Sequence, residues 1–450
     1  MVRAACGPPS RNLILRRDAF RRCRNAEPMP RDRHPSVIRV PEGNTASEGA
    51  FGQRAQPVVW QRGGRTVRHA ATPVGVALVR TGGFTVARLP FRCMPAVHPN
   101  LLVIRRRYLG DIVLLGPFFA NLRRHWPQAR ITALVERPYA ECLSLHPAVD
   151  AGLVLPAPRG RLGEWWQLLR RLRTSGFSHV FDLDNTAKTA VLTRWTGAGF
   201  RVALLHEMPP RRPWLYTHLA IDPPAQHESR SIVEYYLHAL PPAGVPVITH
   251  EVRLVPRAAD VSWAQELLGR LPGGPVPAGT RRLLVHPGSR SPFRLWPPEC
   301  FGEVCRRVRT ELGARVVFVA GPGEQSILQQ ILPHAGADPL VIDQPLSVSQ
   351  FAALAAQFDL LLCHDSGPMH LAAAVGTPVV ALFGSQNMAL WRPSGDQHTL
   401  LQPSMPCRNC VAPGVCVPGD AYHNYCIRSL GVNEVFAAVR EQLARPAGHP

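Results

Sequence analysis

The sequence predicts an α/β protein built from two Rossmann-like domains in tandem. From about residue 100 onward, short apolar runs typical of buried parallel strands alternate with helix-prone segments. A stretch rich in Pro and Gly, residues 241–282, interrupts this alternation once. Polar turns follow several of the apolar runs, and open α/β sheets bind ligands at the carboxyl ends of their strands. We therefore expect a ligand cleft between the two domains.

The first domain is predicted at residues 99–255. Its first helix, 112–126, should kink at Pro117 and end before Pro127. A second, amphipathic helix is expected at 162–173, where apolar side chains recur at helical spacing. The predicted strands are 101–104, 131–135 and 179–183.

The second domain is predicted at residues 282–445, after a linker region at 256–281 that holds one helix, 260–270. Its strands and helices should again alternate, which implies a parallel sheet covered by helices. The predicted strands are 282–285, 315–319, 340–342, 358–363 and 378–383, and the predicted helices are 297–312, 326–332, 347–357 and 368–375.

Residues 367–386 contain no Asp, Glu, Lys or Arg, which raises the alternative of a membrane span. Pro378 would break a helix in the middle of this stretch, and His370 would be an unpaired polar group in lipid. We expect instead a strand, a short helix and a second strand. The turn at 364–367 would join the first strand to the helix.

Residues 1–98 are predicted to be a disordered basic arm. They hold 17 Arg against 5 Asp and Glu, in a chain whose net charge is +20, and they lack apolar periodicity. This composition suits an arm for nucleic acid or an anionic membrane, or a chain start placed too early. No signal peptide is expected, because the apolar run at 12–15 is too short.

Four of the eleven cysteines cluster near the C-terminus: Cys407, Cys410, Cys416 and Cys426. Their spacing allows a structural zinc site. The alternative is a set of reduced thiols, as expected in a reducing cytosol. Both interpretations are left open.

Four turns carry side chains suited to chemistry. Gly110 and Asp111 come after the first strand, and an Asp in the first turn of a helix is either a reactive carboxylate or a simple complement to the helix dipole. The 286–297 loop, with Ser289, Arg290 and Arg294, suits phosphate binding. Glu324 follows a glycine turn and suits ribose hydroxyls. Asp365, Ser366 and Gly367 open a helix whose N-terminus favours an anion, although an ordinary helix cap is the alternative.

These four turns, in this order, resemble motifs of the ADP-heptose:lipopolysaccharide heptosyltransferases of glycosyltransferase family 9, over roughly residues 100–440. The resemblance implies a GT-B fold, with two Rossmann-like domains facing a cleft. It also implies an inverting, metal-independent enzyme without a cofactor. The second domain would bind the nucleotide-sugar donor, and the first would bind the acceptor.

The resemblance also implies residue roles. Asp111 would be the general base, and Gly110 and Lys188 would lie on the acceptor side. Lys188 is the only lysine of the chain, within a 181–189 segment that resembles the family's I-D-L-Q-G-x-x-K-S. Asp184 and Asn185 replace the Gln-Gly pair, which leaves the acceptor open. The donor would be bound by Ser289, Arg290, Arg294, Glu324, Asp365, Ser366, Gly367 and His370.

The predicted function is transfer of a heptose from ADP-heptose to a lipid-linked lipopolysaccharide-core acceptor. The alternatives are another nucleotide-sugar donor, a nucleotide-sugar 2-epimerase and a non-catalytic nucleotide-sugar binder. Asp182 and Asp184 form a D-x-D pair, so a divalent metal is a further alternative. We expect a cytoplasmic protein that binds no nucleic acid. Whether 161–173 touches the inner membrane or is an ordinary surface helix stays open.

Overall fold

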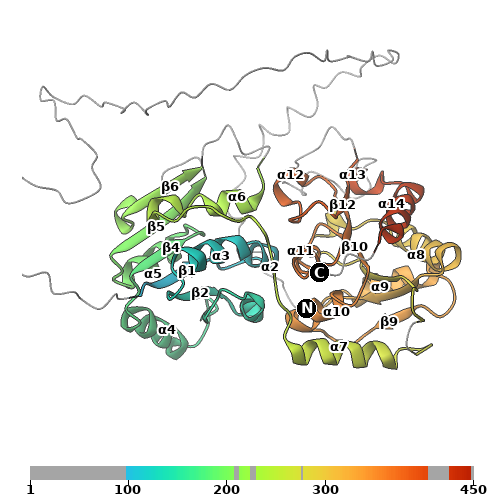
Figure 1. Ribbon diagram of the computed structural model, residues 1–450, viewed down its shortest axis with the longest axis horizontal. Coiled ribbons are helices and arrows are strands. Elements are labelled where there is room, and N and C mark those ends of the chain that lie inside the picture. The colour runs from blue at the N-terminus through green and yellow to red at the C-terminus, as the bar shows by residue number, and fades with distance from the viewer. Residues whose placement is uncertain (1–97, 207–211, 223–229, 275–276, 404–424, 447–450) are drawn as a thin grey trace, which may run out of the picture. The chain divides into compact units, whose positions relative to one another are not determined.

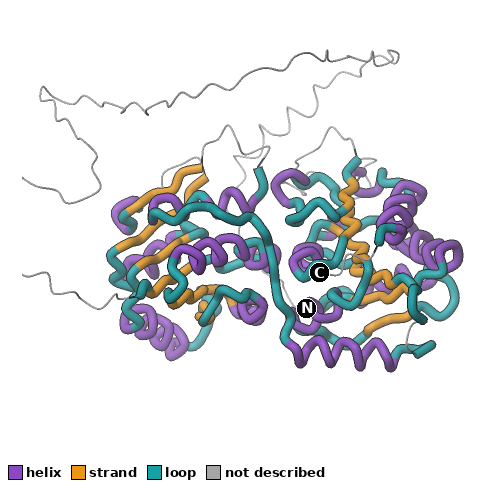
Figure 2. Tube along the Cα trace, viewed as in Figure 1, coloured by secondary structure: helices purple, strands orange, loops and turns teal. Residues whose placement is uncertain are grey.

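The computed structural model describes residues 98–206, 212–222, 230–274, 277–403 and 425–446. Two six-stranded, entirely parallel sheets form its framework, the first coloured blue to green and the second yellow to red in Figure 1. The predicted arm lies outside the described residues, apart from His98. Figure 2 shows that helices and strands are interleaved along most of the described chain.

The first sheet has the strand order β3-β2-β1-β4-β5-β6. Its strands are β1 (Asn100–Ile104), β2 (Arg130–Glu136), β3 (Ala151–Leu155), β4 (His179–Asp182), β5 (Phe200–His206) and β6 (His218–Asp222). Its helices are α2 (Leu109–Val113), α3 (Gly116–His125), α4 (Leu162–Thr174), α5 (Ala187–Trp195) and α6 (Ile232–Leu237), with 3-10 turns η1 (Arg137–Leu145), η2 (Pro213–Leu215) and η4 (Pro241–Ala243).

The second sheet repeats this topology in the order β9-β8-β7-β10-β11-β12. Its strands are β7 (Arg282–His286), β8 (Arg315–Val319), β9 (Leu340–Ile342), β10 (Leu360–His364), β11 (Val379–Leu382) and β12 (Thr399–Leu401). Its α-helices are α7 (Ala258–Arg270), α8 (Pro298–Leu312), α9 (Gln325–Ile331), α10 (Val348–Ala355), α11 (Gly367–Ala374), α12 (Met388–Trp391), α13 (Tyr425–Arg428) and α14 (Val432–Ala444). Short 3-10 turns are η5 (Pro292–Arg294) and η6 (Leu332–His334).

Alternate residues of each strand face opposite sides of its sheet, so each sheet has two separate apolar faces. Leu102 and Ile104 of β1 pack in one buried cluster with α4 and α5. Leu101 and Val103 pack on the other side with α2, α3 and α6. In the second sheet, α8, α9 and α14 cover one face, while α10 and α11 cover the other. Both sheets are therefore doubly wound.

The two halves share a buried core and several polar contacts. One apolar cluster includes Phe119 of α3 as well as Met369 of α11. Ser347 donates a 2.7 Å hydrogen bond from its Oγ to Glu141, and the Leu254 N–H donates a 2.8 Å bond to the Ala374 carbonyl. The predicted linker helix is α7, whose Asp260 carboxylate accepts a hydrogen bond from Ser349.

The prediction of one kinked helix at 112–126 is wrong. The chain forms α2 and α3 instead, separated at residues 114–115, and α2 begins at Leu109 within the predicted turn. Proline lacks a backbone N–H, so Pro117 is tolerated in the first turn of α3 but not inside a continuous helix.

The strand–helix–strand prediction for 358–383 is confirmed. Gly376, with φ +94°, lies between α11 and β11, in a backbone conformation that disfavours other residues. Across the described ranges, no helix is long and apolar enough to cross a membrane.

Candidate active site

The candidate residues lie where each sheet reverses its winding. In both sheets this switch point lies between the first and fourth strands, which are β1 and β4 in one and β7 and β10 in the other. Asp111 follows β1, and Lys188 follows β4. Arg294 follows β7, and Asp365 follows β10. Ligands of doubly wound sheets bind at such a switch point, beyond the carboxyl ends of the strands. The sequence predicted the candidate turns at these strand ends.

Asp111 is a buried carboxylate held by three donors. Arg105 donates from Nη2 to Oδ1 over 2.6 Å, the Tyr236 hydroxyl donates to the same oxygen, and the Tyr108 N–H donates to Oδ2 over 2.8 Å. Burial raises the pKa of the Tyr236 phenol well above its usual value, so the hydroxyl keeps its proton. These donors compensate for the loss of water around the charge.

Arg105 connects this carboxylate to the turn after β4. Its Nη1 donates to Asp184 Oδ1 over 3.2 Å, and the neighbouring Arg106 donates to the other oxygen of Asp184. Arg106 also pairs with Glu136 at 3.2 Å. The base candidate and the β4 turn therefore belong to one network of ion pairs.

The two carboxylates of the D-x-D pair do not converge. Asp182 is buried, caps its own turn by accepting from the N–H groups of residues 184 and 185, and accepts 2.7 Å from the Tyr216 hydroxyl. Burial raises the pKa of Asp182 to about 6, against the opposing effect of these hydrogen bonds. Asp184 instead pairs with the two arginines. Across the described ranges, no three His, Cys, Asp or Glu side chains form a group that could hold a metal.

The start of α2 packs directly on the start of α11. A Cβ on Gly110 would lie 2.7 Å from Cδ2 of His370, and a Cβ on Gly367 would lie 3.0 Å from the Leu109 side chain. A side chain at Gly110 would therefore force a shift of the helix contact or of His370, and one at Gly367 would require the Leu109 side chain to give way. The contact places Asp111 of the first half beside His370 of the second.

His370 is a buried, neutral imidazole. Burial lowers its pKa to about 4, and the Asp111 carboxylate opposes that shift. Its Nδ1 has no hydrogen-bond partner among the described residues. His364 is also buried and accepts 2.8 Å from the Trp296 N–H, and burial lowers its pKa to about 3.

Arg294 and Asp365 form an ion pair at the N-terminus of α11. Arg294 Nη1 lies 3.0 Å from Asp365 Oδ2 and 3.3 Å from the Asp365 carbonyl. Burial raises the pKa of the Asp365 carboxyl, and the guanidinium lowers it in part. Ser366 is the N-cap residue, and its hydroxyl donates to the His364 carbonyl rather than capping the helix. The first N–H groups of α11 therefore have no side-chain cap.

Glu324 folds back over the β7 loop. Its Oε2 accepts 2.9 Å from the Gly321 N–H and lies 3.6 Å from Nε2 of His286. A Cβ on Gly288 would overlap this carboxylate at 1.8 Å, so a side chain there would displace the Glu324 carboxylate. In the same loop, the Arg290 guanidinium lies 3.6 Å from the Tyr108 ring centroid, in a second contact between the halves. Ser289 is half-buried beside it.

Lys188 lies on α5, with its ammonium 5.3 Å from the Trp165 ring centroid. Its helix follows β4, and Arg105, not Lys188, pairs with Asp111 among the described residues. Of the cysteine cluster, Cys407, Cys410 and Cys416 lie outside the described residues, while Cys426 is buried. Cys142, Cys305 and Cys363 are buried free thiols.

Sequence reasoning missed Arg105, Tyr236 and Tyr216. Arg105 belongs to an Arg-Arg-Arg run directly after β1, a signal that was available. Tyr236 lies 125 residues from Asp111 and carries no motif. Only the fold brings it to the carboxylate.

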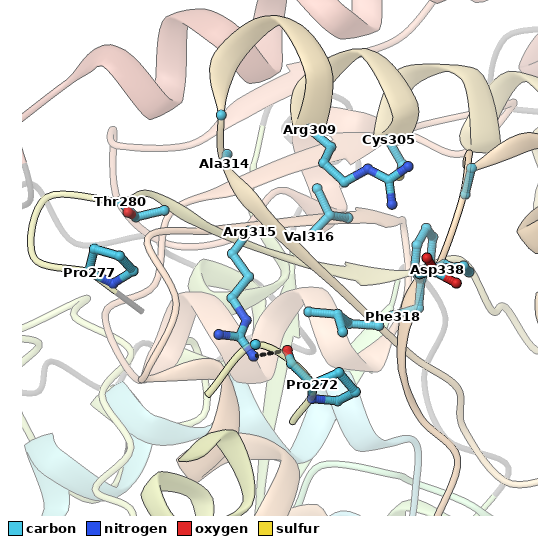
Figure 3. A pocket seen from close by; sticks show the side chains of 15 residues that line it. Pro272, Pro277, Thr280, Cys305, Arg309, Ala314, Arg315, Val316, Phe318 and Asp338 are labelled. Atoms are coloured by element: carbon cyan, nitrogen blue, oxygen red, sulfur yellow. Dashed lines mark hydrogen bonds between the residues drawn. The ribbon is translucent and has the colours of Figure 1, made fainter. Parts of the chain in front are cut away.

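A cavity of about 420 Å³ lies elsewhere, at the amino ends of β8 and β9 (Figure 3). Arg309, Arg315 and Asp338 are among its lining residues, and Arg315 Nη2 donates to the Pro272 carbonyl over 3.1 Å. Because the candidate residues all follow the carboxyl ends of strands, we place the active site there and not in this cavity.

Known proteins are similar to this chain in sequence and in fold. Residues 165–415 match Glycosyltransferase family 9 (heptosyltransferase). The chain is 25% identical to Lipopolysaccharide heptosyltransferase 3 of Escherichia coli, over 64% of this chain and 84% of that protein. The glycosyl transferase family 9 structure from Veillonella parvula has a TM-score of 0.66 at 21% identity, covering 78% of this chain and 98% of that one. The E. coli heptosyltransferase WaaC with ADP has a TM-score of 0.58 at 18% identity, covering 76% and 99%.

The chain therefore belongs to glycosyltransferase family 9. It is a glycosyltransferase with the GT-B arrangement of two Rossmann-like sheets, as the sequence predicted.

The lowered pKa of His370 predicts a pH-dependent stability. The imidazole has a pKa of about 4 in the folded state and about 6.5 in the unfolded state, so between these values only the unfolded state binds the proton. The free energy of unfolding is therefore unaffected by this group above pH 6.5 and falls as the pH drops from 6.5 to 4. His370→Gln should reduce that acid-induced loss of unfolding free energy by roughly 3 kcal/mol. Denaturant unfolding between pH 7 and 4 measures this, with exposed His250→Gln as the control. If the free energy of unfolding changed equally with pH in the wild type, His370→Gln and His250→Gln, His370 would not be a buried, neutral histidine.

Proposed function

We propose that this glycosyltransferase moves a heptose from ADP-heptose to a lipopolysaccharide-core acceptor with inversion at the anomeric carbon. The observation that carries the proposal is the position of Asp111 against His370 and the start of α11. A carboxylate of one half thus meets the anion-binding end of a helix of the other half. The names of the heptosyltransferase relatives support heptose and lipopolysaccharide as the substrate classes.

Asp111 is the proposed general base. Its Oδ1 accepts two hydrogen bonds, whereas Oδ2 accepts one, from the Tyr108 N–H. A carboxylate oxygen can accept about two, so Oδ2 keeps a site for the acceptor hydroxyl. As this hydroxyl attacks the anomeric carbon, its proton passes to Oδ2, and the bond to the nucleoside diphosphate breaks. Arg105 and Tyr236 fix the orientation of the carboxylate during this step.

The leaving diphosphate is proposed to lie against the N-terminus of α11. Helix N-terminal N–H groups without a cap favour an anion, and Arg294 adds a positive charge beside them. Asp365 would not contact a phosphate, because two negative groups repel one another. Its role is to hold Arg294 in place. Charge on the leaving group grows in the transition state, so these groups stabilise it more than the ground state.

Glu324 is proposed to accept hydrogen bonds from the ribose, in exchange for its present contact with the Gly321 N–H. Ser289, Arg290, Ser366, Gly367 and His370 complete the proposed donor site. Gly110 and Lys188 lie on the proposed acceptor side, where Lys188 would meet an anionic group of the core sugar. No step of this mechanism uses a metal or a cofactor. The proposed working place is the cytoplasm, at the face of the inner membrane where a lipid-linked acceptor would lie.

Asp111→Asn should lower kcat by about 10²–10⁴-fold, because asparagine keeps the shape but cannot take the proton. Donor affinity should stay close to that of the wild type, since Asp111 makes no proposed donor contact. Turnover of ADP-heptose with a lipopolysaccharide-core acceptor measures kcat. Asp150→Asn is the control, because Asp150 also pairs with an arginine, at 2.6 Å, but at the amino end of the sheet. Near-normal turnover of Asp111→Asn would mean that another group is the base.

Arg294→Ala should weaken ADP binding by about 10- to 100-fold, the usual range for a lost charge-assisted hydrogen bond. Thermal shift with ADP, UDP and GDP measures both affinity and base preference, because a ligand of the folded state raises the melting temperature. Arg309→Ala is the control, since Arg309 lines the cavity of Figure 3. If Arg309→Ala weakens ADP binding and Arg294→Ala does not, the donor site lies in that cavity.

A further inference from the structure

One outer surface of the first sheet's helices combines exposed apolar and basic side chains. Its large apolar members are Leu162 and Trp166 of α4, Val191 and Trp195 of α5, and Trp214 of η2. Leu162 is 87% exposed, Trp214 is 70% exposed and Trp166 is 66% exposed. We call this the α4–α5 surface. Monomeric proteins seldom expose several large apolar groups so close together.

Its helices pack directly on one another, so these side chains belong to one surface. Trp195 donates a 2.8 Å hydrogen bond from Nε1 to the Leu169 carbonyl, and Lys188 of α5 lies over Trp165 of α4. A pocket of about 270 Å³ is lined by Arg173 of α4, Val191, Arg194 and Trp195 of α5, Gly197, and Leu215 of η2. On α4 itself, Leu162 and Trp166 are four residues apart and therefore share one side of the helix.

The charge of the surface is strongly positive. Residues 162–174, 187–195 and 212–215 together hold six basic side chains and one acidic one, Glu164. Glu164 is already paired with Arg137 at 3.2 Å. The basic side chains are Arg170, Arg171, Arg173, Lys188, Arg194 and Arg212.

This charge decides which partner fits. The N-terminal residues 1–98 are strongly basic, and a second copy would present the same positive surface, so both would be repelled. An anionic bilayer suits both the positive charge and the exposed apolar side chains of the α4–α5 surface. Tryptophan indoles favour the headgroup region, and arginines attract acidic lipid headgroups.

We propose that the α4–α5 surface docks this enzyme on an anionic phospholipid bilayer. The inference rests on the proposed function, in which the acceptor is lipid-linked. The same elements reach the acceptor side of the site, because α5 begins directly after β4 and carries Lys188. Docking through this surface would thus bring the β4 turn near the bilayer surface, where the acceptor sugar is anchored.

The test is sedimentation of the full chain with vesicles of phosphatidylglycerol and phosphatidylethanolamine, compared with vesicles of phosphatidylcholine. Binding to the acidic vesicles should be stronger and should fall with salt. Each arginine near an acidic surface strengthens binding about fivefold, so Arg170→Glu with Arg194→Glu should weaken it by roughly 25-fold or more. Trp166→Ser with Trp214→Ser should also weaken it. Both pairs are exposed, so folding should be preserved.

Two control variants lie on the other side of the first sheet. Arg124→Glu reverses an exposed arginine of α3, and Ile248→Ser removes an exposed apolar side chain whose backbone N–H donates to Asn121 of the same helix. Vesicle binding of both should equal that of the wild type. The proposal would be overturned if the controls lost as much vesicle binding as the α4–α5 variants, or if the α4–α5 variants lost none. So would a dimer in solution that the tryptophan variants dissociate, because the surface would then be a protein interface.

Failure of the docking proposal can be told apart from failure of the proposed function. Turnover with a soluble, delipidated acceptor should be unchanged in the α4–α5 variants. If the wild type turns over this acceptor but the vesicle predictions fail, only the docking surface is refuted. If vesicle binding behaves as predicted but ADP-heptose is not used, the proposed function is refuted and the surface stands.

Discussion

The close packing of α2 against α11 is the constraint on which the candidate site depends. It exists because Gly110 and Gly367 have no side chains where the two helices meet: a Cβ on Gly110 would lie 2.7 Å from the His370 ring. This contact joins the switch points of two sheets with the same winding order. It places the Asp111 carboxylate of the first half beside the uncapped start of α11. A base for the acceptor and an anion site for the donor thereby come together.

Such packing removes water from charged groups, and the surrounding structure compensates for this. Asp111 has Arg105, Tyr236 and a backbone N–H as donors, and Asp365 has Arg294. Burial instead keeps His370 neutral, and its Nδ1 has no hydrogen-bond partner among the described residues. The same compensation explains the D-x-D pair: Asp182 accepts from Tyr216, and Asp184 pairs with Arg105 and Arg106, which follow β1. Removing one partner would leave the other as a buried, uncompensated charge.

Much of this arrangement was predictable because it follows from local patterns. The apolar strands β1, β7 and β10 and the polar turns after them were expected from composition and spacing, and the order of the four turns indicated the family. The break between α2 and α3 was not predicted, because its cause is the combined effect of Pro117 and the short helix that Asp111 and Tyr108 support. Tyr236 could not be found from the sequence, since its distance of 125 residues from Asp111 is bridged only by the tertiary fold.

The most direct test of this account is the activity of Gly110→Ala. The added methyl must push α2 away from His370, and a misplacement of about 1 Å can cost roughly 10²-fold in rate. We therefore predict that kcat falls by about that factor, while ADP affinity stays within a few-fold of the wild type. Gly163→Ala is the control, because a Cβ there meets nothing within 4 Å. Wild-type kcat in Gly110→Ala would show that catalysis does not depend on the contact between α2 and α11.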